Sequence, residues 1–364
     1  MIRFNCFLKI NERILHKATP LQKAAGRSRL LQRTILNGSG FVARFRADLS
    51  QGGFLVLKYT LRRLLMLIPV LAGVALIVFT LLYITPGDPA RMALGEDAPA
   101  EAVEQFRINY GLNDPFFVQF GRYCYKAALQ GDIGRSYVTK APVSEELMAR
   151  FPITLKLAFW AVVLGVALGL PFGIICAIRQ YSFFDSITMV LALIGVAMPN
   201  FWLGVLLILL FSVKLEWLPP SGFNTFAEMI MPVFTLSGGT LAVITRMTRS
   251  SMLEVIRSDY IRTARAKGQK ESVIIWRHAL PNALIPILTI IGMQFGSLLG
   301  GAILTETVFS IPGIGRLVVE SIKMRDFPVV QGGVLYIAVV YCIMNLVVDL
   351  LYAWVDPRIK AKYR

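Results

Sequence analysis

The run LLMLIPVLAGVALIVFTLLYIT, residues 64–85, holds 22 consecutive residues without a charged side chain. A helix of about 20 predominantly apolar residues is long enough to cross the hydrocarbon core of a bilayer. The sequence therefore predicts a first transmembrane helix at Leu64–Thr85. Further apolar runs predict five more spans, at Leu157–Ile178, Ile187–Val213, Met229–Thr245, Ala279–Thr305 and Phe327–Val348.

The composition agrees with this prediction. Of the 364 residues, 55% are hydrophobic and only 16% are charged, whereas a soluble domain carries about 25% charged residues. A net charge of +16 also occurs in nucleic-acid-binding proteins, but those place basic stripes on a soluble fold. Here the basic residues lie beside the apolar runs, which favours the cytoplasmic membrane surface. The predicted fold class is an all-α integral membrane protein with six transmembrane helices.

The distribution of lysine and arginine predicts the orientation. Of the 38 basic residues, 26 lie before Leu64, at Arg179, between Arg246 and Arg277, or in the last seven residues. Segments rich in lysine and arginine stay on the cytoplasmic side. We therefore expect both termini in the cytoplasm and a large external loop between spans 1 and 2, at residues 86–152. Residues 153–362 then form the core of spans 2–6.

Residues 1–56 form a basic N-terminal extension without the apolar stretch and cleavage site of a signal peptide. Two interpretations stay open for it: an amphipathic or disordered surface segment, or an extension upstream of the true start site. Residues 57–85 then hold a cytoplasmic lead-in and span 1. The four cysteines show no CxxC spacing and the chain has two histidines, so we expect neither a disulfide framework nor a metal site.

The segment at 86–152 is far longer than an ordinary connection. It opens with a turn, Pro86-Gly87-Asp88-Pro89, and continues with helix-like stretches at Pro99–Tyr110 and Pro115–Leu129, the second rich in aromatic residues. One interpretation is a small folded cap that packs on the spans. The other is an external docking or gating element. The two do not exclude each other.

The most informative polar segment runs from 252 to 282. A helix is expected to end at Gly268, because glycine suits a left-handed helix end. A second helix is expected from Ser272 until Pro281 breaks it. The result is a basic helix–turn–helix with an apolar side, which on composition alone reads as an amphipathic element on lipid headgroups. The expected apolar side consists of Ile261, Ala264, Val273, Ile274 and Trp276.

This segment resembles the EAA loop of inner-membrane permeases from bacterial ABC importers. Gly268 stands at the glycine of that loop, Leu280-Pro281 at its end and Arg262-Thr263-Ala264 at its small-residue triplet. Only Ala264 fits the strict triplet, and the departure is similar to the peptide-importer version of the loop.

Further motifs resemble the dipeptide, oligopeptide, nickel and glutathione branch of these permeases, and the resemblance covers about residues 57–362. They are Pro86–Pro89, Gly111–Pro115, Glu306–Gly315 and Met324–Pro328.

The resemblance implies a division of labour in the bacterial inner membrane. A binding protein delivers the substrate outside, two homologous permeases form a heterodimeric path, and two cytoplasmic ATPases drive transport. This chain has no phosphate-binding GxxxxGK[ST] motif, so we expect no enzymatic activity and no cofactor bound by it, with ATP and Mg bound by the partner ATPases. By resemblance, the ATPase-coupling residues are Arg262, Thr263, Ala264, Arg265, Lys267, Gly268, Leu280 and Pro281.

The path is expected among the later spans. Glycine rows at Gly165–Gly173 and Gly292–Gly300 read first as helix-packing faces. Polar residues inside spans usually face the interior of a bundle, so the candidates for the path are Asn200, Gln294, Ser297 and Asn345. Candidates for an external gate or loop are Pro86, Gly87, Asp88 and Glu306, and for Glu306 a gate and a loop anchor are equally open.

Two other classes of protein fit the sequence less well. A secondary transporter would show interrupted repeats and buried ionisable couplers, and a membrane-embedded enzyme would need a nucleophile–base or metal constellation. The sequence predicts an importer permease for di- or oligopeptides, with glutathione or a nickel chelate as the alternative cargo.

Overall fold

The computed structural model of the protein describes residues 60–95 and 97–355. By its internal contacts the chain divides into two compact units, Met1–Leu61 with Lys360–Arg364, and Arg62–Ile359. Apart from the first two residues of the first span, every element described below lies in the second unit. The expectations for residues 1–56 fall outside the described residues.

The described residues form helices and no strands, which confirms the all-α prediction. Within them, five helices are long and apolar enough to cross a membrane, and a sixth span is possible if a bent helix pair counts as one. The five are Thr60–Ile84, α6 (Val143–Ile178), α9 (Phe226–Ile256), the stretch Glu271–Gly300, and Phe327–Val348 of α15 (Phe327–Val355).

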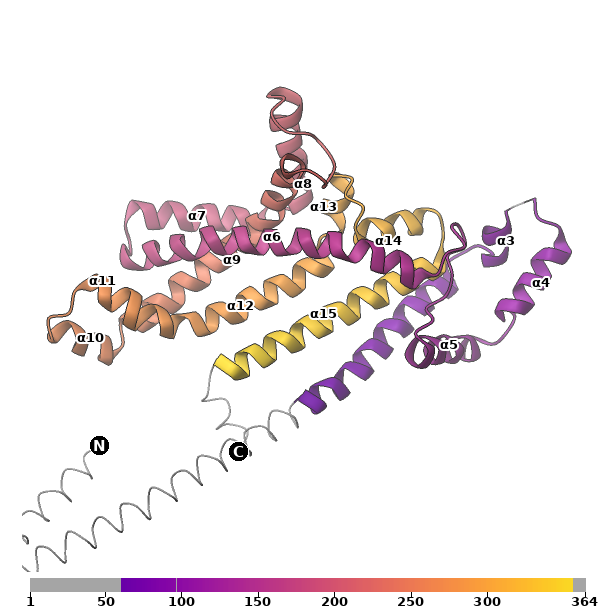
Figure 1. Cartoon of the computed structure of the whole chain (residues 1–364), viewed down its shortest axis with the longest axis horizontal. Helices are drawn as coiled ribbons and strands as arrows, with labels where there is room; N and C mark the ends of the chain where they lie inside the picture. Colours follow the sequence, from indigo (N-terminus) through magenta and orange to yellow (C-terminus); the bar gives the residue numbers. More distant parts are fainter. Residues whose placement is uncertain (1–59, 96, 356–364) are drawn as a thin grey trace, which may run out of the picture. The chain divides into compact units, whose positions relative to one another are not determined.

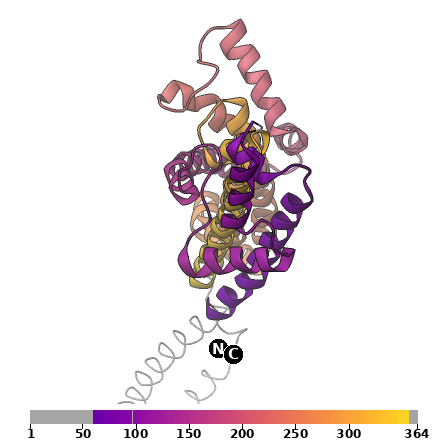
Figure 2. The ribbon, with the colours of Figure 1, turned by 90° about the vertical axis from the view of Figure 1, so that its right-hand side faces the viewer.

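The bent pair replaces the straight third span expected at Ile187–Val213. Helix α7 (Phe183–Ala197) meets the stretch Asn200–Lys214 at 102°. This stretch comprises α8 (Asn200–Leu207) and the π-helix η2 (Ile208–Lys214), and it projects away from the neighbouring helices in Figure 1 and Figure 2. The bend falls at Pro199, because proline disfavours the helical region for the residue before it. Met198 accordingly takes an extended conformation with ψ 123°. The prediction of one straight helix here was wrong.

Two other spans are longer than the apolar runs that predicted them. Helix α6 begins at Val143, so the expected loop 86–152 ends ten residues early, and its 36 residues extend about 54 Å at 1.5 Å per residue. Helix α9 continues eleven residues past Thr245, to Ile256. Lys156 and Arg246 end the apolar runs without ending the helices, because packing against neighbours stabilises the added turns.

The segment between the first span and α6, residues 85–142, is called the cap below. It contains α3 (Pro89–Leu94), α4 (Ala100–Tyr110), α5 (Phe116–Tyr125) and the π-helix η1 (Lys126–Gln130). The rings of Phe116, Phe120 and Tyr123 lie 5.3, 5.5 and 6.3 Å from the ring of Phe79 in the first span. The aromatic residues therefore pack the cap on a span, as the folded-cap interpretation expects. The docking role stays a prediction.

Helices α6 and α9 share the most extensive helix–helix contact among the labelled elements (Figure 1). A Cβ on Gly165 would lie 2.8 Å from Thr240 Cγ2, and one on Gly169 would lie 2.9 Å from the carbonyl oxygen of Leu241. Any larger residue would separate the two backbones. The first glycine row is therefore a packing face, as its spacing predicts.

The second glycine row packs α12 (Leu280–Gly301) against α15. A Cβ on Gly296 would lie 3.8 Å from Met344 and Tyr341, and one on Gly300 would lie 3.6 Å from Ile337. Beyond α12, Ala302 separates it from α13 (Ile303–Val308), so the fifth span ends earlier than the expected Thr305. Helix α14 (Ile314–Lys323) then leads to α15, as Figure 1 shows.

Apolar clusters follow α6 from one end to the other. Near its start, Leu147 packs with Leu317 and Val318 of α14. Along its middle, Leu157 and Ala161 join Met231, Leu236 and Phe309. At its end, Ile174 and Ala177 belong to a third cluster with residues from the basic segment. Helix α6 is thus the element on which the others are assembled.

Replacing Gly169 by alanine should destabilise the protein, because the new methyl group meets the Leu241 carbonyl oxygen and Ile244. Overpacking of this kind costs about 1–3 kcal/mol. Gly73→Ala in the first span is the matched control, since nothing lies within 4 Å of the added Cβ. Thermal unfolding in detergent should show a lower melting temperature for Gly169→Ala only. Equal melting temperatures would contradict the packing role.

Candidate functional site

The basic segment folds as two short helices joined by a tight turn, and is called the two-helix element below. Helix α10 (Asp259–Ala266) is followed by Gly268 with φ +77°, and the chain becomes helical again in α11 (Glu271–Val273). No atom lies within 4 Å of a Cβ built on Gly268. Glycine is therefore required by the left-handed backbone and not by a lack of space.

A π-helical turn follows, and it corrects the role expected for Pro281. The π-helix η3 (Ile274–Ala279) passes directly into α12, where Pro281 lies in the first turn. Glu271 to Gly300 is one continuous helical stretch. Proline is tolerated at a first helical turn, since its missing N–H needs no partner there. The prediction that Pro281 ends the second helix was wrong.

One face of the two-helix element is buried against the ends of α6 and α9. Ile261 and Ile274 are fully buried and pack with Ala177 and Met252, and Ala264 and Leu280 lie at the edge of this cluster. Val273 and Trp276, expected on the same face, are 36% and 61% exposed, and Ile275 is buried in their place. The π-helix accounts for Trp276, because its wider turn rotates the side chains relative to those of an α-helix. Val273 precedes it, in α11.

The cations of the two-helix element differ in their partners. Arg265 donates to both carboxylate oxygens of Glu271, at 2.7 and 3.3 Å, which ties α10 to α11 and raises the pKa of Arg265. Arg262 forms an ion pair with the exposed Asp259, at 3.7 Å. Lys267 is exposed. Thr263 and Pro281 are also exposed, so most of the predicted coupling residues are accessible.

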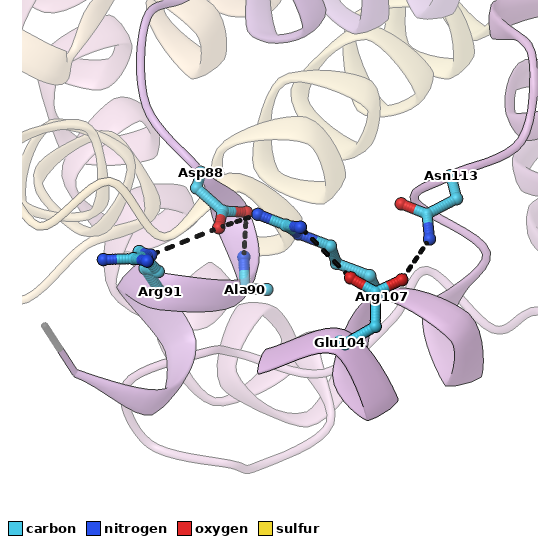
Figure 3. Close-up of polar contacts among 6 residues, drawn as sticks. All are labelled: Asp88, Ala90, Arg91, Glu104, Arg107 and Asn113. Atoms are coloured by element: carbon cyan, nitrogen blue, oxygen red, sulfur yellow. Dashed lines mark hydrogen bonds and ion pairs between the residues drawn. The ribbon is translucent and has the colours of Figure 1, made fainter. Parts of the chain in front are cut away.

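Asp88 organises the entrance to the cap (Figure 3). Its Oδ1 accepts from the Ala90 N–H at 3.1 Å, which caps α3, and Arg107 of α4 donates to its Oδ2 at 2.7 Å. The Arg107 hydrogen bond holds the pKa of Asp88 below its ordinary value, with burial opposing. Gly87, just before, has φ +134°, and a side chain there would collide with Met92. Pro86 is exposed.

Glu306 has the geometry of a loop anchor. It is fully buried, accepts from the Thr154 hydroxyl of α6 at 2.7 Å and from the Arg316 N–H at 3.0 Å, and thereby holds the start of α14. Thr154 Oγ1 in turn accepts from the Ile314 N–H at 3.0 Å. Burial raises the pKa of Glu306, and the hydrogen bonds oppose the shift. A gating role stays a prediction.

The predicted path residues are not joined to one another by any hydrogen bond between described side chains. Asn200 begins α8, and its Oδ1 lies 3.9 Å from the position of a Cβ on Gly239. Asn345 donates to the Tyr341 carbonyl of its own helix at 3.1 Å. Gln294 is half-buried in α12, and Ser297 is exposed. Their place in a path stays a prediction.

Sequence reasoning missed an ion pair between Asp185 of α7 and Arg249 of α9. Arg249 donates from Nε and Nη2 to the two carboxylate oxygens, at 2.6 and 2.8 Å. The Tyr181 N–H donates to the same carboxylate at 2.9 Å. Each residue lies just outside an expected span, where a charged residue is usually taken to mark the end of the helix. Their opposite charges, at the ends of two successive spans, are the signal in the sequence that could have predicted the pair.

Similarity to known proteins decides the family. Residues 169–361, more than half of the chain, match the family described as binding-protein-dependent transport system inner membrane component, and residues 56–158 match the N-terminal region of such membrane components. The chain belongs to this family. The permease is therefore a multi-pass inner-membrane protein, and its family works with ATPase and substrate-binding partners.

Individual relatives agree. The permease is 44% identical over 333 residues to the dipeptide transport system permease protein DppB of Alkalihalophilus pseudofirmus, covering 84% of this chain and 100% of that protein. It is 45% identical over 307 residues to the glutathione transport system permease protein GsiC of Salmonella paratyphi A, with the same coverage. The predicted resemblance to this branch of permeases is confirmed.

Among solved structures, the inward-facing MetNI methionine ABC transporter aligns with a TM-score of 0.48 and 19% identity, over 58% of this chain and 97% of that one.

The Asp88–Arg107 pair predicts a pH dependence of the cap. Because the folded-state pKa lies below the ordinary value of 3.8, its stabilisation is complete above that value and is lost as the pH falls through the lower folded-state pKa. Hydrogen exchange of α3 and α4, corrected for intrinsic rates, should therefore accelerate from about pH 5 to about pH 3. Asp88→Asn keeps a helix cap but should lose this dependence. An unchanged pH profile in the variant would contradict the assignment.

Thr154→Val should destabilise the permease, because it leaves the buried Ile314 N–H without an acceptor and removes a donor from Glu306. An unsatisfied buried group costs about 1–3 kcal/mol. Thr289→Val is the control, since that hydroxyl bonds only the Ile285 carbonyl of its own helix. The melting temperature in detergent should fall for Thr154→Val and stay close to wild type for Thr289→Val. The same melting temperature in both variants would refute the anchor.

Proposed function

We propose that this permease is one of two membrane subunits of an ATP-driven importer for di- and oligopeptides. The two-helix element at residues 252–282 couples it to separate ATPase subunits. Both termini and this element face the cytoplasm, and the cap faces the extracytoplasmic binding protein. The chain itself hydrolyses nothing: ATP and Mg bind to the ATPases, and a second, homologous permease completes the path.

The observation that carries the proposal is the continuity between the two-helix element and the spans. Ile261 of α10 and Ile274 of η3 are both fully buried, in a cluster with Met252 of α9. A push on α10 therefore reaches α9 directly, because close-packed interiors transmit displacement. The same push enters α12, since Glu271–Gly300 is continuous. Helix α12 contacts both α9 and α15, so the motion spreads through the core.

The exposed surface of the two-helix element supports the same role. Arg265 is already bound by Glu271, which stiffens the turn between the helices. Arg262, Lys267 and Trp276 are exposed. Two cations and an aromatic ring suit a partner surface with carboxylates, since arginine and aromatic residues are enriched at protein interfaces. An amphipathic helix resting on lipid would instead turn its apolar face outward, yet here that face is buried in the core.

The relatives point to the cargo. The DppB protein is named for dipeptide transport and the GsiC protein for glutathione transport. Glutathione is itself a small peptide with free carboxylates, so both names describe cargo of one chemical class. Dipeptides and oligopeptides are the proposed substrates, and glutathione is the alternative.

The test uses the complete complex of both permeases, both ATPases and the binding protein in vesicles. Wild-type complex should take up a labelled dipeptide when ATP is supplied, and glutathione should compete poorly. Uptake of glutathione without uptake of peptides would move the assignment to the alternative. ATP-independent, ion-driven uptake by the purified chain alone would overturn it.

Gly268→Val should uncouple this complex. A β-branched residue in a left-handed conformation costs on the order of 1–2 kcal/mol, so the turn reshapes. Substrate-stimulated ATP hydrolysis should fall to the basal rate while membrane insertion and assembly persist. Gly131→Val is the matched control, since Gly131 also has positive φ (+64°) and nothing within 4 Å, but lies in the cap. Wild-type transport by Gly268→Val would rule out the coupling role.

A further inference from the structure

A groove of about 580 Å³ opens between α7, α9 and α12. Its walls are mostly apolar, with Met189 and Leu193 from α7 and Ile290 from α12. Its polar lining comes from Arg246, Arg249 and Ser250 of α9. Pockets that hold small ligands have this size and this mixture of apolar walls and a few polar groups.

The charges in the groove do not balance. Arg249 is neutralised by Asp185, whose side chain is only 4% exposed and accepts two hydrogen bonds from it. Arg246 lies three residues earlier, points to the exposed side of α9, and has no carboxylate within 4.0 Å among the described residues. The groove therefore presents one positive charge that no described carboxylate pairs, just beyond the expected span Met229–Thr245. Ionisable residues on a span normally face a partner or a water-filled cavity.

Two polar residues, Asn200 and Gln294, lie farther along the spans from Arg246. Val243, one turn before Arg246, lines the groove, and one turn before that is Gly239, where Asn200 Oδ1 lies 3.9 Å from the Cβ position. On α12, Gln294 stands one turn after Ile290, on the same face of the helix. Asn200 and Gln294 lie outside the lining of the groove, farther from the two-helix element and toward the other end of α9. A lipid headgroup would need polar partners only at the membrane surface, so polar residues deeper in the spans favour a transported ligand over a lipid.

We propose that Arg246 binds the C-terminal carboxylate of the transported peptide as it passes through the path. The proposal rests on the proposed function and names the group by which the path recognises its cargo. Arginine binds carboxylates in a bidentate manner and stays charged inside a membrane. The apolar walls at Met189, Leu193 and Ile290 would contact the adjoining side chain of the peptide. Arg249 also lines the groove, but its charge is already paired with Asp185, which leaves Arg246 for the cargo.

The experiment compares one labelled tripeptide with its C-terminal amide in the complete complex. Arg246→Gln should lower the uptake rate of the free-acid peptide about tenfold, which corresponds to about 1.4 kcal/mol. Uptake of the amide should stay at its wild-type rate, so the variant no longer distinguishes the two. Arg246→Lys should restore part of the discrimination. The affinity of the binding protein for each peptide is measured separately. It cancels when the acid-to-amide uptake ratio of the variant is compared with that of the wild type, because the same binding protein is used in every complex.

Controls separate this proposal from its rivals. Arg179→Gln removes an exposed charge beside the end of α6, outside the groove, and should leave discrimination unchanged. An equal loss for acid and amide in Arg246→Gln would overturn the proposal, as would failure of that variant to assemble with the second permease. An effect seen only in vesicles containing phosphatidylglycerol, and the same for both peptides, would assign Arg246 to a lipid phosphate instead. If the wild-type complex takes up neither peptide, the proposed function itself fails.

Discussion

The close approach of α6 and α9 is the constraint on which the rest of the structure depends. Three glycines on α6 bring its backbone against the Leu241 and Thr245 carbonyl oxygens of α9. Lipid tails are as apolar as leucine, so helices in a membrane associate through packing and not through the hydrophobic effect. The other helices pack around this contact. Helices α7 and α12 pack on α9, α14 packs on α6, and α15 packs on α6 and α12.

Buried carboxylates then hold together elements that the glycine packing does not join. Glu306 holds the start of α14 against α6, and Asp185 joins α7 to α9. Asp326 accepts from the Ser136 hydroxyl and, at 2.9 Å, from the Tyr137 N–H. Each of these carboxylates binds several donors from a different segment. Isolated buried charges would be costly, and these are stable because their hydrogen bonds are complete.

Hydropathy predicted the number and order of the spans well, because an uninterrupted run of about 20 apolar residues is rare outside membrane spans. The prediction failed where one residue type, such as proline or arginine, was assumed to have the same effect at every position. Pro199 bends a run that holds no charged residue, while Pro281 fails to end a helix because it falls in a first turn. Charges that are paired across helices, such as Arg249, look like span ends when each is read alone. Contacts between segments far apart in the chain are not encoded in any local pattern.

The two-helix element shows the same limit on a smaller scale. Its turn at Gly268 was predictable, because a left-handed residue leaves a glycine in the sequence. Its buried face was only half predictable, since a π-turn at Ile274–Ala279 leaves no mark that periodicity detects. The resemblance to a known loop identified the residues, and the structure showed which of them remain accessible.

The bonds to Asp326 also bear on how the permease is made. Ser136 and Asp326 are separated by 190 residues, and Asp326 immediately precedes α15. During synthesis, the end of the cap around Ser136 therefore lacks this hydrogen-bond partner until the five spans before α15 have been made. The contacts of the cap thus form in order: its aromatic rings can pack on the first span early, and the bonds to Asp326 close last.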